Sequence, residues 1–324
     1  MRRLAALLLI VSTACNPSCV EETSTTPAQA SGSTTVPPAG WVELAPMSLA
    51  RSEHPAVLLG DEVVVAGGFI EVGVGRTGVT STVEAYSPDS DTWRDLPDLP
   101  EARHHGMAAA FGSRVFFIGG YTASGGPSTS VWELVDDVWV DRAPVPEPVA
   151  AGAAVVVGQA IYVLGGAPGG LFLRYDPDGD WWSRLREPAR EREHVASVVL
   201  DGEIWAIAGR WEGEVFDTTE VFDPDTQTWR AGPSLGEARS GFGAAVVDGA
   251  ILVAGGEVFS PDQALASVEL LEPGDDQWAI IEPLPQGLHG NPLVAIDTAA
   301  YLPGGSIRAA AVDNDGLTYR LLPR

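Results

Sequence analysis

Short runs of aliphatic, β-branched and aromatic residues recur along the chain, and each run ends in a pair of small residues. Examples are EVVVAGG, RVFFIGG, AIYVLGG, EIWAIAG and AILVAGG. Runs of this length and composition are typical of strands that are buried on both faces. Other runs with many small residues, such as GAAVV, precede them and suit the crowded centre of a ring. The pattern predicts an all-β chain of many short strands.

Six tryptophans divide the chain into units of constant internal spacing. Each stands 26 residues before the first member of a small-residue doublet. The tryptophans are Trp41, Trp93, Trp139, Trp182, Trp229 and Trp278, and the doublets are Gly67-Gly68, Gly119-Gly120, Gly165-Gly166, Ala208-Gly209, Gly255-Gly256 and Gly304-Gly305. The distance from a doublet to the next tryptophan varies from 17 to 26 residues. We expect the constant part to be packed scaffold and the variable part to contain loops.

Each variable part adds a third strand, an acidic turn and the tryptophan strand, as in VEAYSPDSDTW and TEVFDPDTQTW. Five tryptophans follow an aromatic or apolar residue by seven positions; these residues are Tyr86, Trp132, Tyr175, Phe222 and Leu271. With the doublet and the tryptophan, this pattern closely resembles the kelch repeat over about 280 residues. The resemblance implies a six-bladed kelch-type β-propeller of four antiparallel strands per blade over residues 41–324. Ala208 departs from the family's glycine, and we expect it to leave the backbone nearly unchanged.

Closure of the ring has two candidate strands. The strand of Trp41 opens the chain without a blade of its own, so we favour it as the outer strand of the last blade. The C-terminal VDNDGLTYRLLP also resembles an outer strand, with Tyr319 in the tryptophan place. Both segments would compete for one edge.

Composition excludes several classes of function. The chain has 44 acidic residues against 19 basic ones, a formal net charge of -25, and every basic residue is an arginine. Without lysine, a P-loop and a Schiff-base site are excluded. So much negative charge opposes binding to nucleic acid or anionic lipid, so we expect neither partner. No HExxH or phosphate loop is present, and we expect no cofactor, no metal and no assigned catalytic residue.

The N-terminal residues predict export. Arg2 and Arg3 precede an apolar run of about eight residues, too short to span a bilayer, and small residues follow. We interpret residues 1–14 as a signal peptide and Cys15 as the lipidated residue of a bacterial lipoprotein, which this segment resembles. Plain secretion and a retained anchor are the alternatives. Residues 15–40 are rich in Ser, Thr and Pro and are expected to form a flexible tether.

One rim of the propeller is the expected binding face, because the loops of variable length emerge there. Ten residues after four of the tryptophans stand Arg51, Arg103, Arg192 and Arg239. They resemble the kelch arginine. One interpretation is a structural bond to a neighbouring loop; the other is a cationic collar that binds a carboxylate or an acidic sugar.

Histidines and loop residues complete the candidates on this rim. The further ligand-binding candidates are His104, Glu193, His194, Arg210, Trp211 and His289, with Glu53 and His105 beside them. The histidines could contact a ligand, respond to pH or be ordinary loop residues. Trp211 could stack on a sugar ring or pack beneath a loop. The acidic turns, such as DPDGD, are interpreted as turns of the opposite rim and not as calcium sites.

These features favour an exported, envelope-tethered binding or scaffold module that recognises a glycan or a protein through one rim. We expect a monomer that touches the membrane only through a lipid on Cys15. With that lipid the protein would lie at the outer membrane or cell surface. Without it the protein would be periplasmic or secreted. The alternative is a carbohydrate-active enzyme of the sialic acid mutarotase type. It would use Glu193 or Glu53 as one catalytic group and His104 or His194 as the other.

Overall fold

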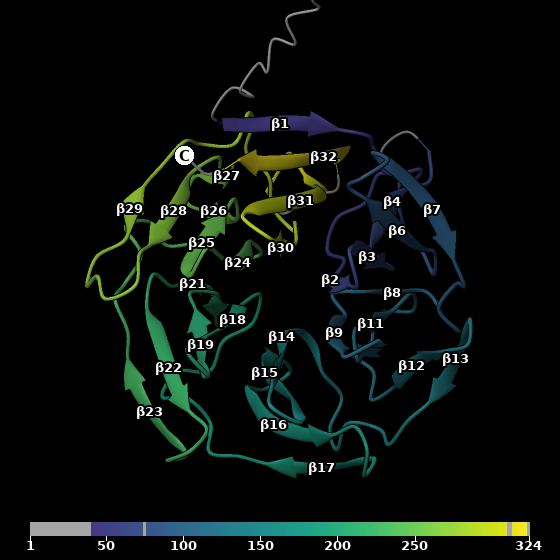
Figure 1. Cartoon of the computed structure of the whole chain (residues 1–324), viewed down its shortest axis with the longest axis horizontal. Helices are drawn as coiled ribbons and strands as arrows, with labels where there is room; N and C mark the ends of the chain where they lie inside the picture. Colours follow the sequence, from purple (N-terminus) through teal and green to yellow (C-terminus); the bar gives the residue numbers. More distant parts are fainter. Residues whose placement is uncertain (1–39, 74–75, 310–312, 323–324) are drawn as a thin grey trace, which may run out of the picture. The chain divides into compact units, whose positions relative to one another are not determined.

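The computed structural model describes residues 40–73, 76–309 and 313–322, in which every regular element is a β-strand. The described residues belong to one compact unit, Ala39–Arg324. This unit is a ring of six four-stranded antiparallel sheets (Figure 1). The predicted all-β, six-bladed propeller is therefore confirmed. The predicted signal peptide, Cys15 and nearly all of the tether lie outside the described residues.

The six blades follow one another along the chain, and in each the first strand is innermost. Blade 1 contains β2 (Ala56–Leu59), β3 (Glu62–Ala66), β6 (Val83–Ser87) and β7 (Thr92–Leu96); blade 2, β9 (Met107–Phe111), β10 (Arg114–Ile118), β12 (Val131–Val135) and β13 (Val138–Asp141); blade 3, β14 (Ala150–Val157), β15 (Ala160–Ala167), β16 (Leu171–Asp176) and β17 (Trp181–Arg184); blade 4, β18 (Ala196–Leu200), β19 (Glu203–Ile207), β22 (Thr219–Asp223) and β23 (Thr228–Ala231); blade 5, β24 (Gly243–Val247), β25 (Ala250–Ala254), β28 (Val268–Leu271) and β29 (Ala279–Ile280); blade 6, β30 (Val294–Ile296), β31 (Ala299–Ser306), β32 (Asn314–Leu322) and β1 (Gly40–Leu44).

Both terminal strands belong to blade 6, which settles how the ring closes. β1 pairs with β32, and β32 pairs with β31, so Trp41 supplies the outer strand as predicted. The expected competition between the two segments was wrong, because β32 is the third strand. Trp41 lies opposite Leu321, whereas Tyr319 lies opposite Glu43 and does not occupy the tryptophan place.

The repeat tryptophans join each blade to the one before it. Every indole N–H donates a hydrogen bond to the backbone carbonyl four residues after the preceding repeat tryptophan, at 2.8–3.2 Å. The acceptors, starting from Trp41, belong to Glu282, Ala45, Pro97, Ala143, Arg186 and Pro233. The first of these bonds runs from the opening strand to the end of blade 5, so the set is a complete circle.

The glycine doublets join each blade to the next one. The N–H of the second doublet residue donates to the carbonyl ten residues after the next tryptophan, at 2.7–3.0 Å, in all six blades. A Cβ on Gly67 would lie 2.5 Å from the Arg103 carbonyl oxygen, so this close approach favours glycine. Tryptophan and doublet thus bind opposite neighbours. Each 26-residue stretch runs from the outer strand of one blade to the end of the second strand of the next blade, and these contacts fix both of its ends.

Ala208 adopts the backbone conformation of the glycines that it replaces. Its φ is 50°, and the five equivalent glycines have φ between 64° and 75°. The expectation that this substitution leaves the backbone nearly unchanged is confirmed. An alanine in the left-handed region costs roughly 1–2 kcal/mol relative to the right-handed one.

Two kinds of connection meet on one rim, as expected. Short hairpins follow three of the doublets: β4 (Phe69–Glu71) with β5 (Thr77–Val79), β20 (Arg210–Trp211) with β21 (Glu214–Val215), and β26 (Glu257–Phe259) with β27 (Asp262–Ala264). After the second doublet, β11 (Tyr121–Thr122) pairs instead with β8 (Arg103–His104), which precedes blade 2. Isolated bridges, such as Ser52 to Phe69 and Glu193 to Arg210, join these segments to the connections between blades. Blade 3 has a short connection here instead of a hairpin. The rim is therefore a continuous layer of paired loops.

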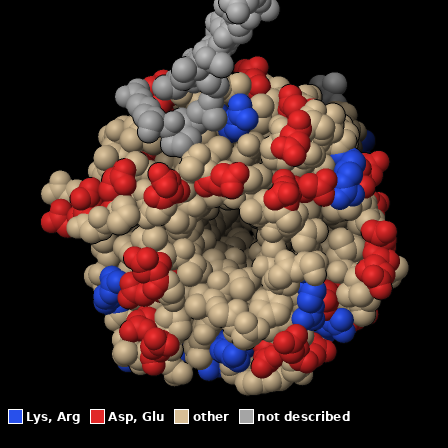
Figure 2. Space-filling model, in the orientation of Figure 1, with Lys and Arg blue, Asp and Glu red and all other residues tan. Residues whose placement is uncertain are grey.

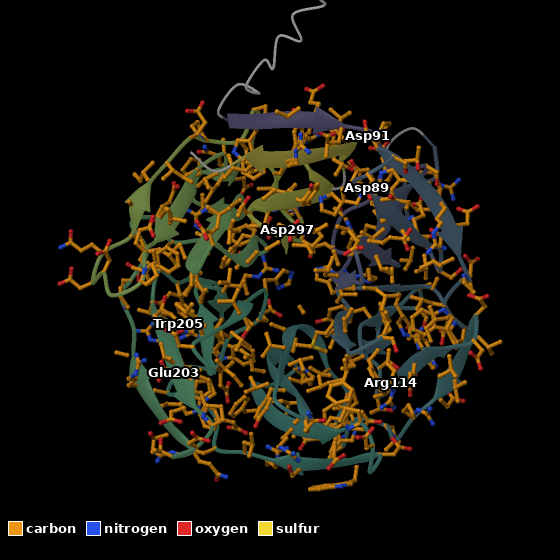
Figure 3. The ribbon with its side chains drawn as sticks, in the orientation of Figure 1. Asp89, Asp91, Arg114, Glu203, Trp205 and Asp297 are labelled. Carbon is orange, nitrogen blue, oxygen red and sulfur yellow. The ribbon has the colours of Figure 1, made fainter. Side chains whose placement is uncertain are left out.

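The opposite rim carries the tight turns. Figure 2 shows acidic side chains spread around one face, with a hollow at its centre. In the same view Asp89 and Asp91 lie toward the edge and Asp297 lies nearer the centre (Figure 3). The Asp176 carboxylate accepts the N–H groups of Asp178 and Gly179, which is ordinary turn geometry. No helix among the described residues is long and apolar enough to cross a membrane.

Candidate functional site

Four arginines occupy the position ten residues after a repeat tryptophan, and all four are buried. We call the six residues at this position the arginine ring: Arg51, Arg103, Val149, Arg192, Arg239 and Leu288. The four arginine residues are at most 2% exposed. In three blades the guanidinium Nη1 donates to the carbonyl of the first doublet residue, at 2.7–3.0 Å; the three pairs are Arg51 with Gly67, Arg192 with Ala208 and Arg239 with Gly255.

Buried glutamates of the third strands neutralise three of these arginines. Arg192 lies 2.6 Å from Glu220, and Arg239 lies 2.7 Å from Glu269. Arg51 makes the same contact with Glu84. Of the two interpretations, this placement favours the structural one and opposes the cationic collar, because these guanidinium groups are enclosed by their own blade. They hold the doublet to the third strand.

Arg103 is also buried, but its surroundings differ. Its guanidinium lies 2.8 Å from Glu101, whose side chain is 56% exposed, and it stacks 5.0 Å from the Trp132 ring centroid. Glu133, on the third strand of this blade, binds Arg114 and Arg142 instead. Arg103 too is therefore a structural residue, with a solvated counter-ion.

A second ring lies two residues further along each repeat, around the central channel. We call it the channel ring; its members are Glu53, His105, Ala151, His194, Gly241 and Gly290. All six have left-handed φ angles of 48° to 61°. Each N–H donates to the carbonyl of the ring member in the preceding blade, at 2.7–3.0 Å, which forms a closed circle of six hydrogen bonds. The backbone is the same in every blade, while the side chains differ.

Three channel-ring side chains meet above the channel. His105 Nε2 lies 2.9 Å from His194 Nε2 and 3.2 Å from Glu53 Oε2. Gly290 leaves room for the Glu53 carboxylate, because a Cβ at this position would lie 2.7 Å from Glu53 Oε1. Two imidazoles and a carboxylate are thus in direct contact.

His104 supports this group from the outside. Its Nδ1 lies 2.6 Å from His105 Nδ1, and its ring stacks on Phe69 with centroids 3.9 Å apart and on Tyr121 at 5.2 Å. Burial lowers the pKa of His104 to about 4. Burial, followed by the neighbouring His194, lowers the pKa of His105 well below its usual value. At neutral pH both imidazoles are therefore uncharged.

Arg210 connects the histidines to two glutamates. Its guanidinium lies 3.0 Å from Glu193 Oε1 and 2.8 Å from Glu257 Oε1, and Nη2 is 3.1 Å from His194 Nε2. The His194 imidazole, with Arg210, lowers the pKa of Glu193 to about 2. His289 Nε2 lies 3.6 Å from Glu257 and 3.8 Å from Glu53. The cluster carries charges of both signs in a largely buried place.

A cavity of about 370 Å³ opens over this cluster. Residues from every blade except the third line it: Ser52, Glu53, Phe69, Thr77, His105, His194, Arg210, Glu257, Phe259 and His289. The central channel, of about 180 Å³, lies beneath, and Glu53, His105 and His194 line both spaces. Arg210 also stacks on Phe259, 4.9 Å from the ring centroid. The arrangement can accept hydrogen bonds, donate them and contact apolar groups.

Comparison with known proteins supplies the family. The model of the KLHDC2/KLHL20/DRC7 kelch-repeats domain matches residues 53–256, and that of the kelch motif matches residues 238–285. The chain belongs to the kelch-repeat family. Kelch propellers are typically protein–protein interaction modules.

Known relatives are distant and longer than this kelch chain. Kelch-like protein terF of Aspergillus terreus is 25% identical over 294 residues, which cover 81% of this chain and 62% of that protein. Human Kelch-like protein 23 is 25% identical over 269 residues, covering 79% and 46%. Mouse Kelch-like protein 35 is 31% identical over 210 residues, covering 64% and 36%. The chain thus spans less than two thirds of the length of these relatives.

A solved structure of YjhT shares the fold of this kelch propeller. The two superpose with a TM-score of 0.71 at 15% identity, over 85% of this chain and 99% of that one. At this level of identity the likeness shows the fold alone.

The kelch propeller brings together about half of the predicted site residues. His104, Glu193, His194, Arg210 and His289 gather at the channel mouth. Trp211 is partly buried in β20 and is not among the residues that line the cavity. Its partner in the β20–β21 hairpin is Glu214.

Several residues of the cavity were not among the predicted site residues. His105 was noted only as a neighbour of the candidates, and Glu53 as a neighbour and as a catalytic group of the mutarotase alternative. Glu257, Phe69 and Phe259 follow the doublets without any common residue type. The position twelve residues after each tryptophan would have revealed Glu53 and His105, because the spacing is constant there while the residue type differs between repeats.

Proposed function

We propose that this kelch propeller is an exported, envelope-tethered binding module that recognises a partner protein through the cavity at the channel mouth. The observation that carries the proposal is the convergence of five blades on one cavity. A site that is assembled from so many blades cannot be explained by the repeat contacts, which hold neighbouring blades in pairs.

The cavity combines features that protein recognition uses. Phe69 and Phe259 offer apolar surface, and Arg210 offers a guanidinium fixed by two carboxylates. Aromatic and arginine side chains dominate the energy of many protein interfaces. A side chain or chain end of the partner that carries an acceptor would fit between them. The general use of kelch propellers for protein binding supports a protein over a glycan.

Cross-linking with mass spectrometry on the exporting cell would identify the partner, and purified components would then test the site. We expect Phe259→Ser and Arg210→Gln each to weaken partner binding by roughly tenfold or more. Matched controls are Trp181→Ser, an exposed aromatic residue on an outer strand, and Arg230→Gln, whose pair with Glu203 is exposed. Both controls should bind normally. Binding that survives the cavity changes, or that needs Trp181, would refute the site.

A glycan array probed with the same variants covers the other ligand class. Specific glycan binding that Phe259→Ser and Arg210→Gln abolish would replace the protein partner in the proposal. If the intact chain binds neither a protein nor a glycan, the proposal is refuted.

Export and lipidation are part of the proposal and have their own test. Residues 1–14 have the pattern of a signal peptide, and Cys15 follows directly. We expect mass spectrometry of the mature N-terminus to find a lipid on Cys15, and Cys15→Ser to release the chain from the membrane fraction. An unmodified, soluble mature chain would favour plain secretion.

A sugar mutarotase is the second candidate, because an acid and a base meet in the same cavity. Glu53 lies 3.2 Å from His105, whereas Glu193 is held by Arg210. Positioned proton donors and acceptors at such distances can catalyse anomer exchange. NMR exchange rates with several acidic sugars would decide, with Glu53→Gln as the inactive variant. A rate equal to that of buffer alone rejects this candidate.

A further inference from the structure

The side chains at the channel mouth have the geometry of a metal site. One carboxylate oxygen of Glu53 and one nitrogen each of His105 and His194 lie within 4.8 Å of one another. The two shortest separations are 2.9 Å and 3.2 Å, both from His105 Nε2. Tetrahedral ligands 2.0–2.1 Å from a zinc ion stand about 3.3 Å apart. Small side-chain shifts would place all three atoms around one ion.

We propose that Glu53, His105 and His194 bind one divalent transition-metal ion, Zn²⁺ by their donor set, at the mouth of the central channel. Two imidazoles and one carboxylate are a frequent ligand set for such ions. This proposal goes beyond partner recognition and stands apart from it, since the cavity can bind a partner with or without an ion.

The backbone holds the three ligands in place. All three belong to the channel ring, where each N–H is bonded to the preceding member. The Ala151 N–H bonds the His105 carbonyl, and the His194 N–H bonds the Ala151 carbonyl, so a small residue separates the two imidazoles. Glycines 241 and 290 leave the other half of the ring open to the Glu53 carboxylate. A rigid backbone circle thus fixes the ligand positions, as precise metal binding requires.

A polar group faces the second ring nitrogen of each histidine, as a hydrogen-bond partner for His105 and as a nearby carboxylate for His194. His105 Nδ1 faces His104 Nδ1 at 2.6 Å, so one of these two nitrogens carries a proton. When His105 is the donor, its Nε2 lone pair is available to an ion. His194 Nδ1 faces Glu193 Oε1 at 3.5 Å, and its Nε2 already accepts from Arg210. Metal-binding histidines are usually oriented by such outer partners.

The charge around the site favours a dication. Three carboxylates, of Glu53, Glu193 and Glu257, stand against the single guanidinium of Arg210. Arg210 Nη2 lies at the nitrogen that the ion would bind, so it competes with the ion. Because its two glutamates anchor Arg210 independently, it can withdraw from His194 and keep both ion pairs. The cavity and the channel then leave a position open for a fourth ligand.

Zinc titration of the full chain, with any affinity tag removed, tests the proposal. We expect one equivalent of Zn²⁺ to bind, and Co²⁺ to give the visible absorption of a tetrahedral site. His105→Asn and His194→Asn should each remove this equivalent, because asparagine accepts a left-handed φ but is a poor zinc ligand. Glu53→Gln should weaken binding by about tenfold or more. Unfolding curves without metal show that each variant is folded.

Glu212→Gln is the matched control for Glu53→Gln. Glu212 is an exposed rim glutamate with a φ of 48°, close to the 52° of Glu53, and it does not line the cavity. It should bind zinc as the unchanged chain does. Zinc bound through Cys15 and Cys19 would persist in every variant. An unchanged zinc equivalent in both histidine variants, or equal competition by Ca²⁺, would overturn the proposal.

Discussion

The arginine ring and the channel ring lie two residues apart in every repeat, yet they obey opposite rules. In the arginine ring one residue type recurs in four blades, and each arginine is buried within its own blade. In the channel ring the backbone conformation recurs in six blades, and the side chains are Glu, His, Ala, His, Gly and Gly. In this propeller, a side chain that recurs from blade to blade therefore has a structural role.

The difference follows from what each ring contacts. An arginine that binds a doublet carbonyl and a third-strand glutamate meets the same groups in each blade, so the same residue suits several blades. Channel-ring side chains meet one another across the axis, where all blades contribute to one space. A repeated backbone that carries different side chains is therefore where this fold can build a unique site.

The largest expected effect is the loss of an arginine whose counter-ion is buried. Arg239→Met should lower the free energy of unfolding by roughly 3–5 kcal/mol, because it leaves the Glu269 carboxylate buried without its counter-ion, with only the N–H groups of Gly236 and Glu237 as donors. Arg230→Met, which removes an exposed pair, should cost less than about 1 kcal/mol. Chemical denaturation measures both. If Arg239→Met is as stable as the unchanged chain but no longer binds the partner protein, the arginine ring is a ligand-binding site and not scaffold.

A smaller loss is expected from Arg103→Met. Its counter-ion Glu101 is 56% exposed and stays hydrated, so the change removes chiefly the contacts with Trp132 and Ser128. We expect a loss of about 1–2 kcal/mol by the same measurement. A loss equal to that of Arg239→Met would show that the buried counter-ion does not decide the cost.

A change beside the channel ring should strengthen zinc binding. Arg210→Gln removes the cation that competes at His194, so zinc affinity should rise by about tenfold, read by competition with a chelator. Arg190→Gln, on the surface beside Glu214, is the control and should leave zinc affinity unchanged. Weaker zinc binding in Arg210→Gln would mean that the guanidinium supports the ligands and does not oppose the ion.

The smallest expected effect concerns the doublet that anchors the arginine ring. Ala208→Gly should raise the free energy of unfolding by about 0.5–1 kcal/mol, because it relieves a left-handed alanine. Gly255→Ala should lower the free energy of unfolding, since the added Cβ would lie 2.5 Å from the Leu288 carbonyl oxygen. Thermal unfolding of both variants measures the pair. No gain in Ala208→Gly would show that blade 4 has adapted fully to alanine.

Much of the fold could be predicted from the chain because its defining contacts repeat. The tryptophan spacing predicted six blades, and Ala208 was correctly placed in a doublet. The strand of Tyr319 was misassigned, because third and fourth strands have similar patterns and only pairing with β1 distinguishes them. The arginines were ambiguous for a related reason. Their glutamates lie 28 to 33 residues away, across loops of unequal length, so no fixed spacing announces the pairs.

The sequence by itself determined the number of blades and the rim that carries the loops, because each repeat contacts its neighbours at fixed positions. Only the tertiary structure decided that the arginines are internal and that Glu53, His105 and His194 form one cluster. His105 and His194 are 89 residues apart and meet because closure of the ring turns equivalent positions toward a common axis. Contacts between neighbouring blades produce a recurring spacing of residue types in the sequence, whereas contacts across the axis produce no such spacing.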